Sequence, residues 1–186
     1  MNPKSFTFSL ILSILALSSQ AHSQIANTET FQTIKVFVLN HDIESQGVGE
    51  QIGTVQFADS EDGLVIKTAI GFLTTGEHGF HVHENPSCEF KNVDDHLVPG
   101  LSAGGHYDPE HAGKHLGPNG MGHLGDLPKV IVDQNGESHQ TLIAPRLNLK
   151  MIQGRSIIIH EAGDNYSDTP NKLGGGGARV ACGVIE

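Results

Sequence analysis

Histidines crowd the middle of this 186-residue chain, where their imidazole rings could bind metal ions. Neutral imidazole is the commonest nitrogen ligand for zinc and copper. The segment from residue 78 to residue 126 ends on a carboxylate, contains no pair of cysteines, and is followed later by His160 at the end of an apolar run. This composition predicts a metal site of imidazoles and one carboxylate. Eight of the twelve histidines lie in the segment: His78, His81, His83, His96, His106, His111, His115 and His123.

Two of these histidines, His81 and His83, alternate within the short stretch 79–84, which we expect to be a strand. Side chains two residues apart in a strand point to the same face. The two imidazoles would therefore form a rigid pair of ligands, while Val82 points into the core. His160 could complete the set from a neighbouring strand.

Four further candidates lie within 21 residues of the loop that follows. Three imidazoles and a carboxylate suit a closed tetrahedral zinc site, and such a zinc would be structural because the loop would depend on it for order. The alternative is that each residue is an ordinary solvated loop residue. The four are His106, His115, His123 and Asp126.

Alternation of apolar and polar residues, together with turn signals, predicts about eight short strands and no helix of normal length. This pattern is typical of an all-β sandwich or barrel in one domain. Long loops such as 85–128 are normally functional or disordered, and metal cross-linking fits the histidines better. The expected strands are 31–40, 51–58, 64–73, 79–84, 129–133, 138–144, 155–160 and 179–185, with hairpin turns at 60–63 and 134–137, an irregular stretch at 145–151 and a second long loop at 163–177.

The first 23 residues are typical of a secretory signal peptide. Lys4 supplies one positive charge, residues 6–17 are mostly apolar, and residues 19–23 offer a small-x-small cleavage site. A membrane anchor is the alternative, but the apolar run is shorter than the about 20 residues that span a bilayer. We expect one exported domain, residues 24–186, that has no contact with a membrane after cleavage.

Charge and cysteine content narrow the function classes. The formal net charge is −10, and −11 without the signal segment, so nucleic acid is a poor partner. Cys88 and Cys182 are the only cysteines. In an exported chain they suggest one disulfide, which would stabilise the fold by about 4–5 kcal/mol in the chain-entropy model. Two free thiols are the alternative.

Four motifs resemble copper,zinc superoxide dismutases of the bacterial periplasmic type, and the likeness covers essentially all of residues 24–186. The resemblance implies a flattened, eight-stranded Greek-key β-barrel with two long functional loops. The motifs are Gly-Phe-His-Val-His-Glu at 79–84, Gly-Gly-His-Tyr-Asp-Pro at 104–109, Gly-His-Leu-Gly-Asp-Leu-Pro at 122–128 and Gly-Gly-Gly-Gly-Ala-Arg-Val-Ala-Cys-Gly-Val-Ile at 174–185.

The resemblance also implies one copper and one zinc in each subunit, with His106 bridging both. Outside the two ligand sets, Asp164 would link ligands of the two metals, and Arg179 would lie beside the copper. Lys91 is a weaker candidate for attracting the substrate. The implied copper ligands are His81, His83, His106 and His160; the implied zinc ligands are His106, His115, His123 and Asp126; the implied disulfide joins Cys88 and Cys182.

The remaining histidines match no ligand position of the family. His78 would pack and hydrogen-bond near one end of the barrel. We expect His41, His96, His111 and His139 to be solvated.

The activity that the resemblance implies is an oxidoreductase reaction: two superoxide anions and two protons become dioxygen and hydrogen peroxide. The expected partner is superoxide alone, and the protein would be a periplasmic monomer or homodimer. The first alternative is a periplasmic protein that buffers copper or zinc without catalysis, for which Arg179 would be unnecessary. The second is a catalytically dead metallochaperone barrel, but such relatives usually lack ligands and none is missing here.

Overall fold

The computed structural model describes residues 30–186, so the expected signal segment lies outside the described residues. No helix in the described part is long and apolar enough to cross a membrane. The strands are β1 Gln32–Leu39, β2 Val48–Ser60, β3 Gly63–Ile70, β4 Gly76–His78, β5 Phe80–His83, β6 Lys91–Val93, β7 His96–Val98, β8 Val130–Val132, β9 Thr141–Ala144, β10 Arg155–His160 and β11 Arg179–Ile185. The short helices are η1 Leu101–Ala103, α1 Leu149–Ile152 and η2 Lys172–Gly175.

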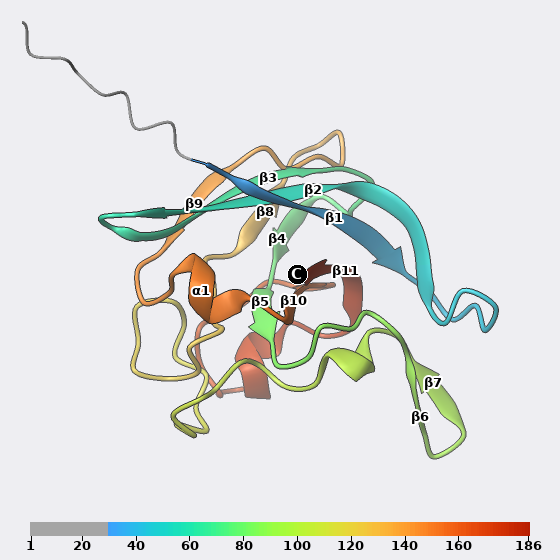
Figure 1. Ribbon diagram of the computed structural model, residues 1–186. Helices are drawn as coiled ribbons and strands as arrows, with labels where there is room; N and C mark the ends of the chain where they lie inside the picture. Colours follow the sequence, from blue (N-terminus) through green and yellow to red (C-terminus); the bar gives the residue numbers. More distant parts are fainter. Residues whose placement is uncertain (1–29) are drawn as a thin grey trace, which may run out of the picture.

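An antiparallel sheet of seven strands forms the body of the molecule, in the order β5-β10-β11-β1-β2-β3-β9. It curls so that β1, β2, β3 and β9 form an upper layer and β5, β10 and β11 cross beneath them (Figure 1). β4 pairs with β8 and runs into β5 through Gly79 alone. If β4 and β5 are counted as one strand and the separate β6–β7 hairpin is left out, the eight strands of the expected barrel remain. The all-β prediction is confirmed.

Strand β10 is buried on both faces, and each face serves a different apolar cluster. Ile157 and Ile159 belong to the main core between the layers. Ile158 points the other way, into a smaller cluster that contains the disulfide between Cys88 and Cys182. The disulfide therefore joins the loop after β5 to β11, as expected.

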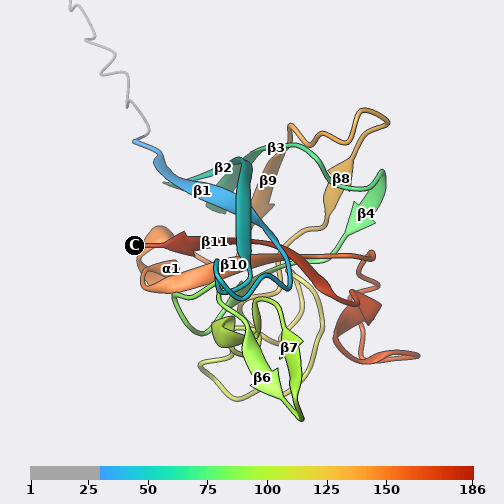
Figure 2. The same ribbon diagram turned by 90° about the vertical axis from the view of Figure 1, so that its right-hand side faces the viewer.

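The pairing predicted around residues 134–137 is wrong, although the turn itself forms. The amide of Gly136, at φ 80°, donates to the carbonyl of Asp133. β8 then pairs with β4, and β9 pairs with β3, so the two flanking strands enter different sheets (Figure 2). The expected strand 138–144 begins only at Thr141. Turn chemistry is local, whereas the choice of a pairing partner is not.

Several short elements were not expected, including the two 3₁₀ helices η1 and η2. Within the first long loop, β6 and β7 form a hairpin whose two linking residues, Asp94 and Asp95, have φ of 50° and 62°. Within 145–151, helix α1 begins after Asn148, whose side chain accepts a hydrogen bond from the amide of Met151. Both stretches otherwise lack regular strands, and in both views the first long loop lies below β10 (Figures 1 and 2).

Candidate metal centre

Strand β5 carries two of the candidate ligands, His81 and His83, and both are fully buried. The loop that follows returns along the same strand, because His81 bridges antiparallel to Asp126 and His83 bridges to His106. Residues far apart in the sequence are thus fixed to one short strand by backbone hydrogen bonds. Phe80 and Val82 face the main core, as the alternation predicted.

Gly125 shows how closely the loop approaches β5. Its carbonyl accepts the amide of Val82, and its own amide donates to the carbonyl of Tyr107. A Cβ atom at this position would lie 2.2 Å from the carbonyl oxygen of Val82. Only glycine allows this contact, which sets Asp126 beside His81.

Four histidines form a first group whose ligand atoms lie within 4.8 Å of one another: His81, His83, His106 and His160. In three of them one ring nitrogen donates to an oxygen that can only accept. Nε2 of His81 lies 2.8 Å from Asp164, Nδ1 of His83 lies 3.0 Å from the carbonyl of Gly104, and Nδ1 of His160 lies 3.2 Å from that of Gly177. The second nitrogen of each neutral ring then carries a lone pair. These second nitrogens are buried and have no hydrogen-bond partner.

Burial keeps these rings neutral. It lowers the pKa of His81 and His83 well below the ordinary 6.5, and neighbouring imidazoles lower it further. Burial also lowers the pKa of His160 to about 4. Metals bind neutral imidazole, so the group can accept a cation at neutral pH without first losing protons.

A second group surrounds one oxygen of Asp126. Oδ1 lies 3.0 Å from Nδ1 of His106, 3.0 Å from Nδ1 of His115 and 3.4 Å from Nδ1 of His123. The nitrogens of His115 and His123 are buried without hydrogen bonds. Tetrahedral zinc with bonds of about 2.0 Å holds its ligand atoms about 3.3 Å apart. The three distances fit that spacing.

His115 and Asp126 shift each other's pKa in this second group. Burial alone would lower the pKa of His115, but the carboxylates of Asp126 and Asp164 outweigh it and raise the pKa to about 9. Burial would raise the pKa of Asp126, but His106 and His115 hold it well below its ordinary value. A metal ion would supply positive charge beside these carboxylates, as the proton on His115 does.

His123, an expected zinc ligand, does not belong to the closest set of candidate ligand atoms. Around Asp126, the ligand atoms that all lie within 4.8 Å of one another belong to His81, His106, His115 and Asp126, and His123 is not among them. Nε2 of His81 is already bonded to Asp164, which leaves His81 only its Nδ1 for a metal. His123 has its unpaired Nδ1 beside Asp126 and belongs chemically to the second group.

Two carboxylates tie the second long loop to these ligands. Asp164 accepts from Nε2 of His81 at 2.8 Å and from Nε2 of His115 at 2.7 Å, so it joins the two groups. Asp168 accepts from the amide of His115 at 2.9 Å and from that of Leu173 at 3.1 Å. Asp168 was not foreseen, because this contact joins loops 53 residues apart and leaves no local signal.

Arg179 lies at the start of β11 and is half-buried. Its guanidinium donates to the carbonyls of Gly100 at 2.6 Å and Gly104 at 2.7 Å. The Gly104 carbonyl also accepts Nδ1 of His83. Arg179 thus shares an acceptor with a residue of the first group, which places a positive charge beside that group.

The other candidates lie apart from the two groups. His78 is buried, and its ring nitrogens contact the carbonyls of His160 and Thr74. Lys91 is exposed on the β6–β7 hairpin. The four histidines expected to be solvated, His41, His96, His111 and His139, are all exposed.

Comparisons with known proteins agree with this geometry. A sequence model of the family described as copper/zinc superoxide dismutase matches residues 51–185. A superoxide dismutase (Cu-Zn) of Brucella abortus biovar 1 (strain 9-941) is 52% identical over 141 residues, which cover 75% of this chain and 82% of the relative. The chain belongs to the copper/zinc superoxide dismutase family.

Solved structures support the same assignment. The Cu/Zn superoxide dismutase from Brucella abortus superposes with a TM-score of 0.80 at 48% identity, covering 84% of this chain and 100% of that one. The monomeric copper, zinc superoxide dismutase from Salmonella enterica gives a TM-score of 0.74 at 44% identity, covering 84% and 100%. The protein is an oxidoreductase that converts superoxide to dioxygen and hydrogen peroxide, with copper and zinc as cofactors.

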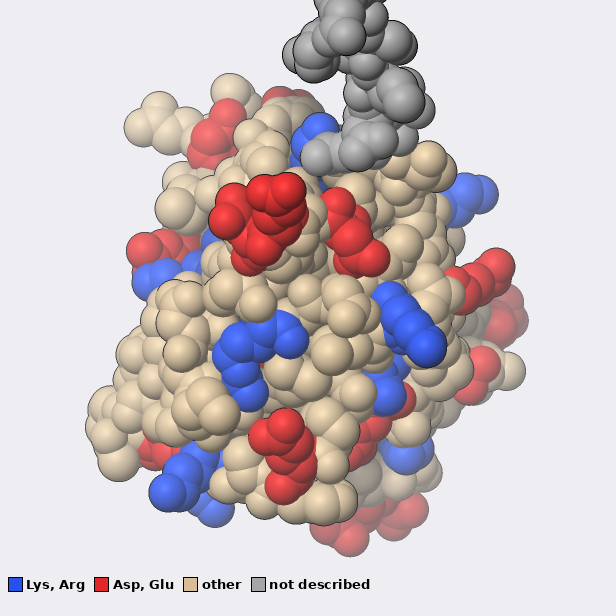
Figure 3. All heavy atoms as spheres, turned by 60° about the vertical axis from the view of Figure 1, so that its left-hand side comes forward, with Lys and Arg blue, Asp and Glu red and all other residues tan. Residues whose placement is uncertain are grey.

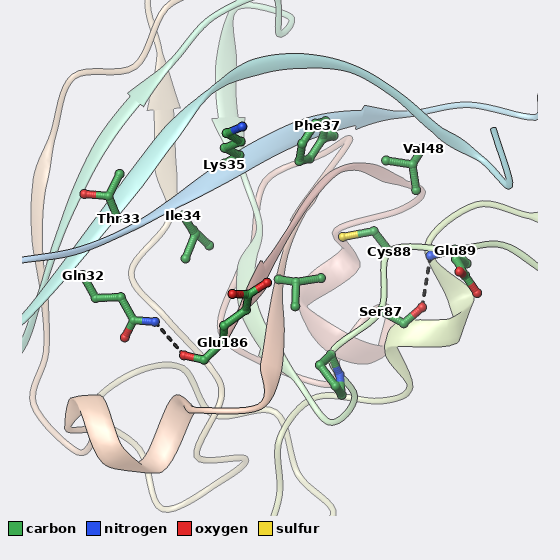
Figure 4. Close-up of a pocket in the computed structure, with 12 residues that line it drawn as sticks. Gln32, Thr33, Ile34, Lys35, Phe37, Val48, Ser87, Cys88, Glu89 and Glu186 are labelled. Carbon is green, nitrogen blue, oxygen red and sulfur yellow. Dashed lines mark hydrogen bonds between the residues drawn. The ribbon is translucent and has the colours of Figure 1, made fainter.

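The surface of this dismutase shows mixed charge on one face (Figure 3) and an open hollow that no candidate metal ligand lines. Acidic and basic side chains are interspersed on the face drawn in Figure 3, so the negative charge is not gathered there. An open hollow of about 640 Å³ lies beside β1 and β11 and is lined in part by Lys35, Cys88 and Glu186 (Figure 4). No histidine lines this hollow.

Proposed function

We propose a specific division of ligands between the two metals of this enzyme. Copper would be held by His81, His83, His106 and His160, and zinc by His106, His115, His123 and Asp126. His106 would serve both metals through its two ring nitrogens.

One observation carries this proposal: buried imidazole nitrogens converge without hydrogen-bond partners. They belong to His81, His83, His115, His123 and His160. A buried polar atom without a partner is costly in a folded protein. Five in one region are explained together if each binds a metal ion.

The two metals would supply different chemistry: copper changes oxidation state by one electron, and zinc, which has no redox chemistry, would hold the loop in order. The protein's own groups would do the rest. Nδ1 of His106 lies against Asp126, so the opposite nitrogen, Nε2, is the atom that could hold a proton and pass it to reduced substrate. Asp164 would keep the donor nitrogens of His81 and His115 protonated.

Arg179 would attract and orient the anionic substrate. The enzyme carries a net charge of −10, which repels superoxide at long range. A fixed guanidinium beside the first group would reverse that field locally, because low-dielectric walls focus field lines. Burial lowers the pKa of Arg179, yet guanidinium stays charged at any working pH.

We also infer that residues 1–23 export the enzyme to the periplasm and are removed, leaving residues 24–186 as one domain that acts as a monomer or homodimer. Support comes from the composition of that segment and from the Salmonella enterica relative, which is described as monomeric. Mass spectrometry of the secreted chain and sedimentation analysis would test both points.

The test of the function is metal analysis with a superoxide-dismutation assay before and after copper removal. We expect one copper and one zinc per chain. Activity should be lost when copper is removed and should recover when copper is added back. His139→Gln is a matched control, because His139 is exposed and outside both groups. Tight metal binding without dismutation would favour a buffering protein instead.

A further inference from the structure

Arg146 clamps the segment that leads into His123. Its Nη1 donates to the carbonyl of Gly120 and, at 3.3 Å, to that of His123, and its Nη2 donates to the carbonyl of Gly122 at 3.0 Å. One guanidinium thus binds three backbone oxygens within four residues. The planar fork of arginine suits such multiple contacts, because its donors are fixed relative to one another.

The base of this side chain is anchored in the main core. Arg146 follows β9 and lies between Ala144 and Leu147, which are 2% and 3% exposed. No carboxylate among residues 30–186 lies within 4.0 Å of the Arg146 guanidinium. Arg146 therefore forms no salt bridge with these residues, and its guanidinium donates to backbone carbonyls of the loop instead.

Residues 120–123, which Arg146 binds, pack against the loop segment that carries His115. The amide of His123 donates to the carbonyl of Lys114 at 2.9 Å. A Cβ atom on Gly122 would lie 2.3 Å from that same carbonyl, so the two segments touch without room for a side chain. Arg146 binds three carbonyls of the same segment, so residues 120–123 are held both by Arg146 and by the segment that carries His115.

We propose that Arg146 is a positioning residue for zinc: it fixes the backbone of residues 120–123 and thereby aims Nδ1 of His123 at Asp126. The proposal rests on the assignment of His123 to zinc. Arg146 contacts none of the ligand side chains; its three contacts are to backbone oxygens, one of them on His123 itself.

The direction in which zinc affinity changes when Arg146 is replaced distinguishes a positioning role from a purely electrostatic one. A guanidinium next to a zinc site repels the incoming dication, so removing its charge would strengthen zinc binding on electrostatic grounds alone. Removing a residue that orients a ligand weakens binding, and loss of such outer partners typically costs 10–100-fold in metal affinity. The two readings predict opposite changes.

The experiment measures zinc and copper affinities of the metal-free protein by competition with chromophoric chelators. We expect Arg146→Gln to bind zinc 10–100-fold more weakly while copper affinity changes less than about threefold. Arg146→Lys keeps the charge but loses the fork, so we expect it to fall between Arg146→Gln and the unaltered protein. Lys150→Gln is the matched control, because Lys150 is an exposed cation on the neighbouring helix α1.

Unchanged or tighter zinc binding in Arg146→Gln and Arg146→Lys would overturn the proposal. The proposal would also be overturned if these variants lost zinc and copper affinity equally and in proportion to a lower melting temperature. Such a result would mean that Arg146 stabilises the fold as a whole. If Arg146→Gln does not fold, Arg146→Lys decides alone. An unaltered protein that binds no zinc would instead overturn the ligand assignment, and the role of Arg146 with it.

Discussion

Nδ1 of His106 lies 3.0 Å from Oδ1 of Asp126, and both side chains are buried. The ring of His106 also stacks on that of His81, with centroids 3.9 Å apart. His106 and His81 both belong to each of the two candidate groups, but His81 has one nitrogen committed to Asp164. We therefore propose His106, rather than His81, as the residue that couples the two metals.

Replacing His106 with Ala should uncouple the two metals and loosen the loop. We expect zinc affinity to fall at least tenfold, because a ligand is lost beside Asp126, and the copper(II) absorption and paramagnetic resonance spectra to change. His111→Ala, in the same loop but exposed, is the control. Full zinc affinity with an unaltered copper spectrum would refute the bridge.

Replacing Arg179 with Ala should lower turnover and flatten its dependence on ionic strength. Local fields of this kind raise association rates by about 10–10³-fold, so we expect kcat/KM to fall tenfold or more at low salt. Arg179→Lys keeps the charge but cannot reach both Gly100 and Gly104 in the same way, and should retain part of the salt dependence. Stopped-flow assays across salt concentrations measure both; an unchanged rate and slope would exclude the role.

The disulfide between Cys88 and Cys182 should contribute strongly to stability. It links residues 94 apart, and losing such a bridge costs about 2–5 kcal/mol. Denaturant unfolding of the Cys88→Ser, Cys182→Ser double variant measures the difference. Because Ile158 and Leu39 pack around the bridge, a loss below 1 kcal/mol would mean that packing alone holds this loop.

The metal-free enzyme should lose stability as the pH falls below about 6.5. Burial lowers the pKa of His81, His83 and His160 below the ordinary 6.5, and that of His160 to about 4. Between the ordinary pKa and the lowered pKa of each ring, the unfolded chain binds more protons than the folded one. The free energy of unfolding then decreases as protons are added. His115, with its pKa raised to about 9, acts in the opposite sense: its contribution is full below 6.5 and is lost as the pH rises through about 9.

Denaturant unfolding of the metal-free protein from pH 4.5 to pH 7 checks this prediction. His139→Gln should leave the slope unchanged, since His139 is exposed. A free energy of unfolding that stays constant or rises toward pH 5 would contradict neutral burial of the three rings.

Local patterns predicted the strands that carry candidate site residues. β10 and β11 begin and end at the expected residues, 155–160 and 179–185, and the alternation in β5 correctly separated His81 and His83 from Val82. Apolar periodicity and side-chain direction depend on neighbouring residues only, so the sequence carries them directly.

Features set by contacts between distant segments could not be derived in this way. The different partners of β8 and β9, the Asp168 contact to His115 and the Arg146 clamp all join residues at least 23 apart. The hairpin of β6 and β7 did have a local signal: Asp94 and Asp95 tolerate the positive φ that a two-residue hairpin needs, with Val93 before them and Leu97 and Val98 shortly after.

The shared imidazole is tested most directly by a crystal structure of the enzyme loaded with copper and zinc, with anomalous scattering recorded at both absorption edges. We expect a copper peak and a zinc peak on opposite sides of the His106 ring, each in contact with one of its nitrogens, with Asp126 on the zinc side. A map in which His106 contacts a single metal, or in which both metals lie on the same side of the ring, would contradict it.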